Sequence, residues 1–381
     1  MSGGLRIAVL KERATGEQRV AASAETVKKF IALGAAVAVE SGAGVSASVG
    51  DAAYAAAGAE VVTAAQAVKG ADIVLGIQGP EVALLKGAKP GAWVVAGLDP
   101  FAQRVKIDAY AAAGYEALAM EFMPRITRAQ SMDILSSQSN LAGYKAVIAA
   151  ADAYGRAFPM MMTAAGTVSA AKAFVMGVGV AGLQAIATAR RLGAQVSATD
   201  VRSATKEQIM SLGAKPVFVE SVAGIEGEGA GGYATEMSEE YQKAQAELVS
   251  AHIAKQDIVI TTALIPGRTA PRLVTDAQIA TMKAGSVIYD LAVAQGDGTG
   301  GNVEGSKPDE VVVKHGVKII GFANTATHLA ADASALFSRN LYNFLSEFWD
   351  KDTGRPVLDE EIGNAVRLTQ GGKVVHERLL G

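Results

Sequence analysis

Short apolar runs alternate with alanine-rich helical patterns along the whole of this 381-residue chain. That alternation is typical of βαβ units arranged around a parallel sheet. The strands predicted in the first half are Leu5–Leu10, Ala36–Glu40, Glu60–Thr63, Asp72–Ile77, Ala92–Ala96 and Tyr115–Met120. Those predicted in the second half are Lys172–Met176, Gln195–Thr199, Pro216–Val219, Asp257–Thr262, Ser286–Leu291 and Val317–Gly321. Six strands in each half predict an α/β chain with two doubly wound, Rossmann-like parallel-sheet domains and a cleft between them. A single barrel would need eight evenly spaced units and no second core.

Composition excludes several classes of function. Half of the residues are apolar, 19% are charged and the net charge is −3, which argues against disorder. Without clustered lysines and arginines, we expect no nucleic-acid partner. The absence of cysteine excludes disulfides, thiolate zinc sites and a cysteine nucleophile. The four histidines are scattered, and we predict no metal site.

One stretch is long enough to cross a membrane. Residues 157–189 carry a single charge, Lys172. Four glycines interrupt the stretch, however, and a buried strand, turn and helix explain the same apolarity. We therefore expect no membrane span, and the first residues lack the apolar region of a signal peptide.

The domain boundary is predicted near residue 140. Polar residues at Ser136–Asn140 are expected to cap a helix over Leu141–Ala157. A helical pattern at Ala335–Phe348 predicts that the chain returns to the first domain. The first domain would then comprise residues 1–140 and 325–381, and the second residues 141–324.

Three segments have little periodicity. The last thirty residues are predicted to form a surface tail. The glycine-rich residues 224–232 and 295–305 are predicted to be flexible loops, because glycine gains most freedom when unfolded. A mobile loop of this kind can act as a lid over a ligand.

A glycine motif follows the predicted strand Lys172–Met176. It reads Gly177-x-Gly179-x-x-Gly182 and leads into a predicted helix over Leu183–Leu192. The first glycine permits a tight turn, the second admits a diphosphate to the backbone, and the third lets the helix pack on the strand. The helix N-terminus adds partial positive charge for phosphates. With its flanking strand and helix, the motif predicts a dinucleotide site; the alternative is a glycine-rich turn without a ligand.

Asp200 ends the next predicted strand and indicates which dinucleotide binds. A carboxylate there accepts hydrogen bonds from both ribose hydroxyls and repels a 2′-phosphate, so we predict NAD(H). Arg202 leaves NADP open, because an arginine there can accept that phosphate. A similar run at residues 42–47 lacks a following helix and is predicted to be a turn.

Longer motifs extend along the chain. They are Lys11–Val20, Glu40–Gly44, Met123–Ser136, Gly231–Met237 and Thr261–Gly267. With the glycine motif, they make the whole chain resemble the NAD(H)-binding alpha subunit (domain I) of proton-translocating NAD(P) transhydrogenase. The wider family includes alanine dehydrogenase. The segments 322–328 and 296–301 depart from the expected pattern.

The resemblance implies a set of nucleotide contacts. These are Arg125, Ile126, Thr127, Gln130, Ser131, Met132, Asp133, Ser136, Gly177, Gly179, Val180, Gly182, Asp200, Val201, Arg202, Gly232, Tyr233 and Leu264. Among them, Gln130, Arg125 and Asp133 would serve the reaction at the nicotinamide end, and Tyr233 would close a loop over the nucleotide. From spacing alone, an Arg125–Asp133 ion pair and a helix cap at Asp133 or Ser136 explain the same residues.

The resemblance also implies an activity. Hydride would pass directly from NADH to NADP⁺ bound on a partner subunit, coupled to proton translocation by a membrane subunit. The chain would be a homodimer on the cytoplasmic face of the inner membrane, held there by its partners. It would be either a complete alpha subunit of the three-subunit form or a segment of a longer one.

Two other functions remain open. An alanine-type dehydrogenase needs an acid/base. In the resemblance, a lysine from Gly76–Pro80 and a histidine near Gly97–Pro100 would supply it, and both segments lack those residues. Direct hydride transfer moves no proton and needs neither. A non-catalytic NAD-binding protein is the other alternative.

Overall fold

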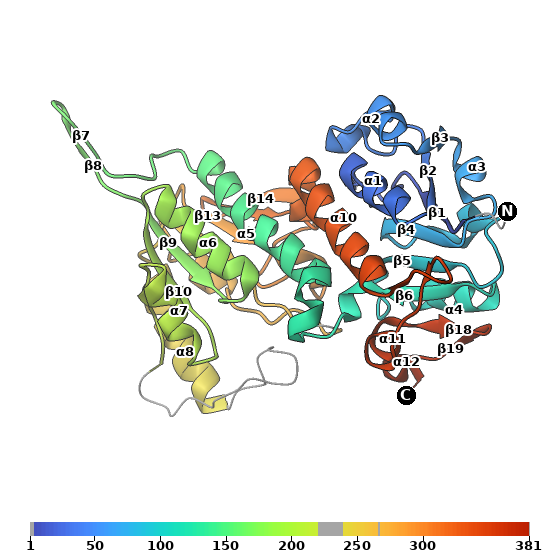
Figure 1. Ribbon diagram of the computed structural model, residues 1–381. Helices are drawn as coiled ribbons and strands as arrows, with labels where there is room; N and C mark the ends of the chain where they lie inside the picture. Colours follow the sequence, from blue (N-terminus) through green and yellow to red (C-terminus); the bar gives the residue numbers. More distant parts are fainter. Residues whose placement is uncertain (1–3, 220–238, 266, 381) are drawn as a thin grey trace. The chain divides into compact units, whose positions relative to one another are not determined.

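The computed structural model describes residues 4–219, 239–265 and 267–380. The chain divides into two units, residues 1–138 with 327–381 and residues 139–326 (Figure 1). Helix α5 (Ile134–Ala153) begins in the first unit and continues into the second.

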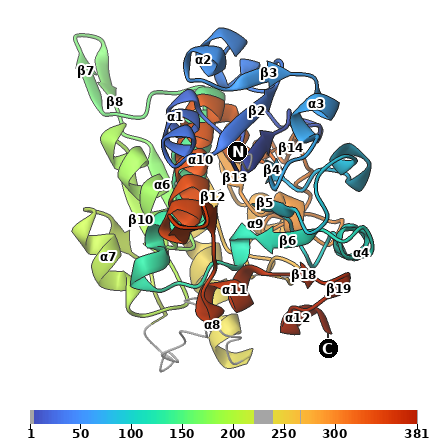
Figure 2. The same ribbon diagram turned by 45° about the vertical axis from the view of Figure 1, so that its right-hand side comes forward.

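Six parallel strands form the sheet of the first unit, in the order β3-β2-β1-β4-β5-β6. They are β1 (Arg6–Val9), β2 (Ala36–Glu40), β3 (Glu60–Val62), β4 (Ile73–Gln78), β5 (Trp93–Gly97) and β6 (Glu116–Ala119). Helices α1 (Ala24–Ala32), α2 (Asp51–Ala56) and α10 (Ala330–Glu347) cover one face, and α3 (Ala64–Val68) and α4 (Arg104–Ala112) cover the other (Figure 2). Alternate residues of β1 enter the two cores, because successive side chains of a strand point to opposite faces.

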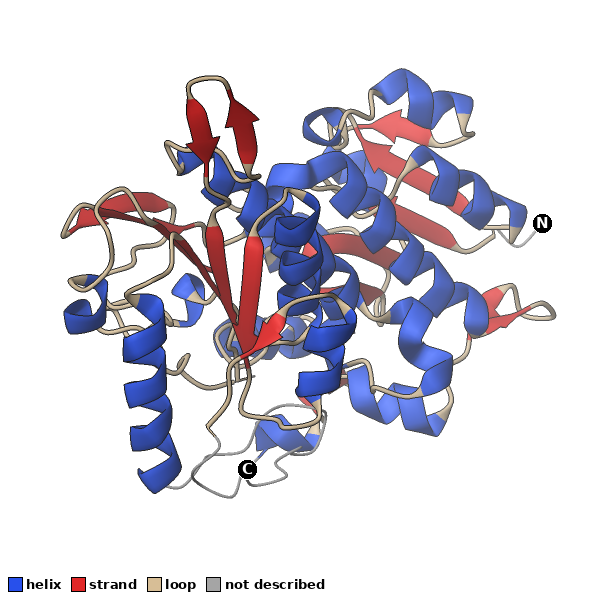
Figure 3. Ribbon diagram, turned by 90° about the vertical axis from the view of Figure 1, so that its left-hand side faces the viewer, coloured by secondary structure: helices blue, strands red, loops and turns tan. Residues whose placement is uncertain are grey.

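The second unit has a seven-stranded sheet in the order β11-β10-β9-β12-β13-β15-β14. Figure 3 shows the strands of the chain in red and the helices in blue. Its strands are β9 (Lys172–Met176), β10 (Gln195–Thr199), β11 (Lys215–Pro216), β12 (Ile258–Thr261), β13 (Val287–Asp290), β14 (Glu310–Lys314) and β15 (Val317–Gly321). Its helices are α6 (Val180–Arg191), α7 (Thr205–Ser211), α8 (Glu239–Ile253) and α9 (Asp276–Ile279). Two doubly wound α/β units confirm the predicted fold class.

The sheet of the second unit has one antiparallel edge strand that the sequence pattern did not predict. Strand β14 pairs with β15 in the antiparallel sense. The tight turn between them places His315 at φ 50° and Gly316 at φ 78°. Two further strands outside the main sheet, β7 (Met161–Thr163) and β8 (Gly166–Val168), form a hairpin that projects from its unit (Figure 1).

Each sheet carries the same carboxylate contact at the amino ends of its two central strands. In the first unit, Asp72 Oδ2 accepts a hydrogen bond of 2.9 Å from the N–H of Arg6, at the start of β1. In the second, Asp257 Oδ2 accepts one of 2.9 Å from the N–H of Lys172, at the start of β9. Each aspartate also pairs with a lysine, at 2.8 Å and 3.2 Å respectively. These contacts join β1 to the start of β4 in the first unit and β9 to the start of β12 in the second.

The last thirty residues are not a surface tail. They form β17 (Arg355–Pro356), which pairs with the preceding β16 (Trp349–Asp350), and then α11 (Glu360–Val366), β18 (Thr369–Gln370), β19 (Lys373–Val374) and α12 (Glu377–Leu380). Leu368 is fully buried in the first unit. Thr369 Oγ1 accepts from the N–H of Ala117 and donates to the carbonyl of Tyr115, both at 2.8 Å. The prediction failed because these elements are too short to show periodicity.

The remaining short helices are of the 3₁₀ type. They are η1 (Val45–Ala47), η2 (Val82–Leu85), η3 (Met120–Phe122), η4 (Thr127–Met132), η5 (Val293–Gln295) and η6 (Thr325–Leu329). Among the described residues, no helix combines the length and apolar character needed to cross a membrane.

Candidate functional site

The glycine motif forms the turn between β9 and α6. Gly177 lies at φ 100°, in the left-handed region that favours glycine, and Gly179 is the N-cap of α6. The helix begins at Val180, three residues before the predicted start at Leu183. A Cβ on Gly182 would lie 1.9 Å from the carbonyl oxygen of Gly177, whereas one on Gly179 would meet no atom of the described residues within 4 Å. The third glycine therefore permits close packing, and the second leaves open space over the first turn of α6.

The carboxyl ends of β9 and β12 meet at this turn. These strands are neighbours at the centre of the sheet, and β10, which is parallel to β9, lies on the other side of β9 from β12. Ligands of open α/β sheets bind at such a reversal of strand order. Thr262, which follows β12, donates from its hydroxyl to the carbonyl of Gly177 at 3.0 Å. The exposed side chains of Val180 and Leu264 lie at the same sheet edge.

Asp200 follows β10 and is buried beside the glycine turn. Its Oδ2 accepts from the N–H of Val178 at 2.7 Å. Arg202 supplies three more donors, from its backbone N–H and Nε at 2.9 Å each and from Nη2 at 3.0 Å. Burial alone would raise the pKa of Asp200, but these hydrogen bonds outweigh burial and lower it below its ordinary value. The carboxylate is therefore ionised at neutral pH.

This arrangement constrains how a ribose could bind. A carboxylate has about four acceptor positions, and Val178 and Arg202 already occupy four. A ribose hydroxyl must therefore replace a donor from Arg202. Val201, between the two charged residues, is partly buried.

The predicted nicotinamide loop, residues 125–136, belongs to the first unit. Arg125, Thr127, Gln130 and Ser131 are exposed there, and Ile126 is partly buried. Met132 is 2% exposed in the hydrophobic core, so its side chain is not available to a ligand in this arrangement. The carbonyl of Ser131 accepts from Nδ2 of two asparagines of α10, at 2.8 and 3.1 Å.

Asp133 and Ser136 cap helix α5. Asp133 Oδ1 accepts from the N–H of Ser136 at 3.0 Å, and Ser136 Oγ donates to Asp133 Oδ2 at 2.5 Å. The prediction that residues 136–140 precede the helix is wrong, because α5 already begins at Ile134. Gly232 and Tyr233 lie outside the described residues.

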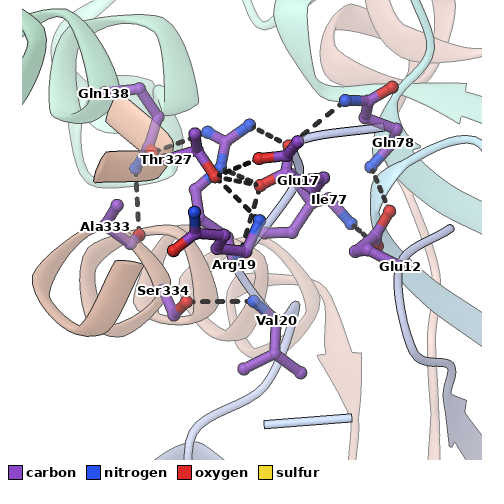
Figure 4. Close-up of polar contacts among 12 residues, drawn as sticks. Glu12, Glu17, Arg19, Val20, Ile77, Gln78, Gln138, Thr327, Ala333 and Ser334 are labelled. Atoms are coloured by element: carbon purple, nitrogen blue, oxygen red, sulfur yellow. Dashed lines mark hydrogen bonds and ion pairs between the residues drawn. The ribbon is translucent and has the colours of Figure 1, made fainter. Parts of the chain in front are cut away.

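A buried ion pair between Glu17 and Arg19 lies beside Gln78, within the segment Gly76–Pro80 (Figure 4). Gln78, at the end of β4, donates from Nε2 to Glu17 Oε2 at 3.1 Å. Arg19 donates from Nε and Nη2 to the two carboxylate oxygens of Glu17, at 2.8 and 2.7 Å. Its Nη1 donates to Gln138 Oε1 at 2.8 Å. Burial alone would raise the pKa of Glu17, but the bonds from Arg19 lower it to about 2. Glu17 is thus a fixed anion that cannot exchange protons near neutral pH.

Two other glutamates are acid/base candidates in the first unit that the sequence pattern did not reveal. Glu12 accepts from the N–H of Ile77 at 2.7 Å and lines a cavity of about 160 Å³. Burial raises its pKa to about 7. Burial likewise raises the pKa of Glu121 to about 7. Their only sequence signal was position, since each follows the end of a buried strand.

No group of three potential metal ligands occurs among the described residues.

Comparison with known proteins covers nearly the whole chain. Residues 8–142 match the N-terminal domain of alanine dehydrogenase/PNT, and residues 146–377 match its C-terminal domain. An NAD(P) transhydrogenase subunit alpha polypeptide of Rhodospirillum rubrum is 54% identical over 99% of each chain. The solved structure of a transhydrogenase from Sinorhizobium meliloti is 53% identical, with a TM-score of 0.88 over 97% of this chain and all of that one.

An L-alanine dehydrogenase structure shares the fold, with a TM-score of 0.80 over 98% of each chain at 24% identity. At that identity the likeness concerns architecture alone. The much higher identity to transhydrogenase subunits extends over both units. The chain therefore belongs to the alanine dehydrogenase/PNT family, and within it to the relatives of the transhydrogenase alpha subunit.

Proposed function

We propose that this chain is the NAD(H)-binding component of a proton-translocating transhydrogenase. It would donate hydride from NADH directly to NADP⁺ held by a partner subunit. The observation that carries the proposal is the glycine turn, with open space over Gly179 and an ionised Asp200 beside it. High identity to transhydrogenase alpha subunits over the full length supports the choice of reaction.

The turn fits a dinucleotide diphosphate. Because no described residue lies within 4 Å of the position that a Cβ on Gly179 would take, phosphate oxygens can approach the N–H groups that begin α6. Asp200 would accept from the adenine ribose once Arg202 releases a donor, and its charge would repel a 2′-phosphate. NAD(H) is therefore the proposed ligand of this chain, and NADP(H) that of the partner.

Bound NADH would supply a hydride at C4 of its nicotinamide. The task of the protein is then to hold the ring at near-attack distance and to keep water out. We assign ring positioning to the loop with Arg125 and Gln130, whose side chains are exposed and long enough to contact a ligand. Asp133 would orient the start of α5 through its cap, and Ser136 would share that role. Tyr233 would close over the nucleotide.

The remaining components belong to the same proposal. The chain would act as a homodimer, with an NADP(H)-binding subunit and a membrane subunit that conducts protons. Proton translocation would belong to the membrane subunit, because hydride transfer itself moves no proton. These partners would hold the chain at the cytoplasmic face of the inner membrane.

A mixing experiment tests the proposal. The chain is combined with the NADP(H)-binding subunit of a transhydrogenase, and hydride transfer from NADH to an NADP⁺ analogue is followed by absorbance. Transfer that requires both proteins supports the proposal. Reduction of pyruvate with ammonia by this chain alone, without transfer, would instead identify an amino-acid dehydrogenase. Binding of NADH without turnover in either assay would identify a non-catalytic binding protein.

The cofactor preference has a separate test. Asp200→Ala should weaken NADH binding by about 1.5–3 kcal/mol, the range for a hydrogen bond to a charged group. Titration of NADH fluorescence measures the change, and an unaltered dissociation constant would exclude the ribose role of Asp200.

A further inference from the structure

The glycine-rich segment at residues 295–305 is ordered, contrary to its prediction as a flexible loop. Asp290, fully buried at the end of β13, organises it. Its carboxylate accepts from the N–H groups of Asn302 and Val303, at 3.3 and 3.1 Å, and from Ser306 Oγ at 2.6 Å. A Cβ on Gly301 would lie 2.7 Å from Asp290 Oδ2. The glycine there allows close packing around a buried anion.

Asn302 projects from this segment and is itself fully buried. Its Oδ1 accepts from the N–H of Ala263 at 3.0 Å. Its Nδ2 donates to the carbonyls of Ala263 and Pro271, at 2.9 and 2.8 Å. Because one partner is a donor and two are acceptors, only one orientation of the amide satisfies all three. Asn302 therefore binds the backbone after β12 at two points, Ala263 and Pro271.

That loop forms one wall of the glycine turn. Thr262, next to Ala263, donates to the carbonyl of Gly177 at 3.0 Å. A Cβ on Gly177 would lie 2.5 Å from Thr262 Oγ1 and 3.3 Å from the nitrogen of Ala263. Contacts thus run without a gap from Asp290 through Asn302 and Ala263 to the first glycine of the motif.

We propose that Asn302 is a positioning residue for NAD(H) binding, which it serves by bracing the Thr262–Ala263 wall against the glycine turn. The brace sets how closely the turn and the backbone after β12 approach each other, and so the space left for the diphosphate. Asn302 touches no ligand itself. This inference rests on the proposed function, because the affinity that the brace controls is that for NADH.

The main test uses Asn302→Ala and Thr262→Val, singly and together. Each variant breaks one link of the same chain of contacts. We expect the dissociation constant for NADH to rise about tenfold in Asn302→Ala, equivalent to about 1.4 kcal/mol. It should rise less in the double variant than the product of the two single effects, because linked residues act non-additively. Fluorescence titration well below the melting temperature of each variant gives these constants.

A second arm needs no nucleotide. Amide hydrogen exchange of residues 174–183, measured by mass spectrometry on the free chain, should be faster in Asn302→Ala and Thr262→Val. The control is Ser286→Ala, which removes a buried hydroxyl that bonds the carbonyl of Gln256 at the opposite edge of the sheet. That control should leave both NADH affinity and this exchange unchanged.

The outcomes separate the two proposals. A parent chain that binds no NADH would overturn the proposed function, while the exchange measurement would still decide whether the brace holds the turn. Parent-like NADH affinity and parent-like exchange in Asn302→Ala, even with a lower melting temperature, would reduce Asn302 to a residue of general stability. If Asn302→Ala does not fold, Thr262→Val alone decides by the same two measurements.

Discussion

Two alanine substitutions in the glycine motif should separate folding from nucleotide binding. The sites lie three residues apart, but their surroundings differ. A Cβ on Gly182 would lie 1.9 Å from the oxygen of Gly177, whereas real Cβ contacts essentially never fall below 3.0 Å. The start of α6 must therefore move by at least 1.1 Å, the difference between these distances. In the part of the chain that the structure describes, a Cβ on Gly179 meets no atom within 4 Å, and the φ of −79° and ψ of −165° at this residue suit alanine.

The magnitudes follow from these contacts. Overpacking of the kind forced by Gly182→Ala costs about 1–3 kcal/mol. A loss of 1 kcal/mol lowers the melting temperature by about 2–4 °C in a unit of this size. At Gly179, alanine is a poorer N-cap by up to about 1 kcal/mol, but it offsets about 0.4–1 kcal/mol of this by restricting the unfolded chain. Gly179→Ala should therefore melt within about 2 °C of the parent chain.

Gly179→Ala, which should hardly change the melting temperature, should weaken NADH binding. The new methyl group of Gly179→Ala occupies the open space through which phosphate oxygens would reach the N–H groups of α6. Loss of one charge-assisted hydrogen bond, about 1.5–3 kcal/mol, raises the dissociation constant by between about tenfold and a hundredfold. Gly182→Ala should lose both stability and affinity.

Thermal melts by circular dichroism and NADH titrations on the same samples measure both quantities. Parent-like melting of Gly182→Ala would show that α6 does not pack on the turn as described. Parent-like NADH affinity of Gly179→Ala would show that the diphosphate does not lie over that residue.

Three further predictions concern the first unit. Glu12→Gln removes a carboxyl whose pKa burial raises to about 7. Because this pKa is raised, the parent chain should lose stability as pH rises from 4.5 through 7. The free energy of unfolding of the variant, measured by urea denaturation relative to that of the parent, should rise by about 3 kcal/mol between pH 4.5 and 8. A difference that does not change with pH would contradict this. Glu17→Gln should cost about 3–5 kcal/mol at pH 7, because it leaves Arg19 buried without its counter-charge. Since the pKa of Glu17 is lowered to about 2, the stability that its ionised form gives the parent should be lost as pH falls from 4.5 through 2, whereas the variant has no such loss. If the free energies of unfolding of the two chains fall equally with pH, Glu17 is not an anion paired with Arg19. Gln130→Ala should slow hydride transfer in the mixed system more than it weakens NADH binding, and equal losses would leave Gln130 a simple binding residue.

The predictable elements of this fold are those with strong local signals. The strands β2, β9, β10 and β15 occupy the predicted residues, because each is a short run of mostly apolar or small residues between turn residues. The antiparallel strand β14 escaped prediction, since it lies at an edge and leaves Val311 and Val313 more than half exposed. Its apolar run is only three valines long and lies between the charged residues Glu310 and Lys314.

In the candidate site, too, only the features with a local sequence signal were predictable. The glycine turn and Asp200 were predictable, because a short spacing in sequence fixes their geometry. The roles of Asn302 and Glu12 were not, since each depends on backbone groups far away in the chain. Asn302 contacts Ala263, thirty-nine residues away, and Glu12 contacts Ile77, sixty-five residues away. The segment 295–305 was wrongly predicted to be flexible, because glycine also occurs where the chain packs closely, as Gly301 does against Asp290.

The aspartates at the amino edges of the two sheets, Asp72 and Asp257, have a consequence for how such a chain can diversify. Each joins its central strands at the amino edge, opposite to the carboxyl edge at which open α/β sheets generally bind ligands. The amino edge therefore joins those strands independently of the contacts that Glu12 and Thr262 make at the carboxyl edge. One copy of this frame carries a glycine turn at that edge, and the other carries a buried ion pair and a proton-binding glutamate. A scaffold anchored on one side can exchange its chemistry on the other while its architecture stays the same.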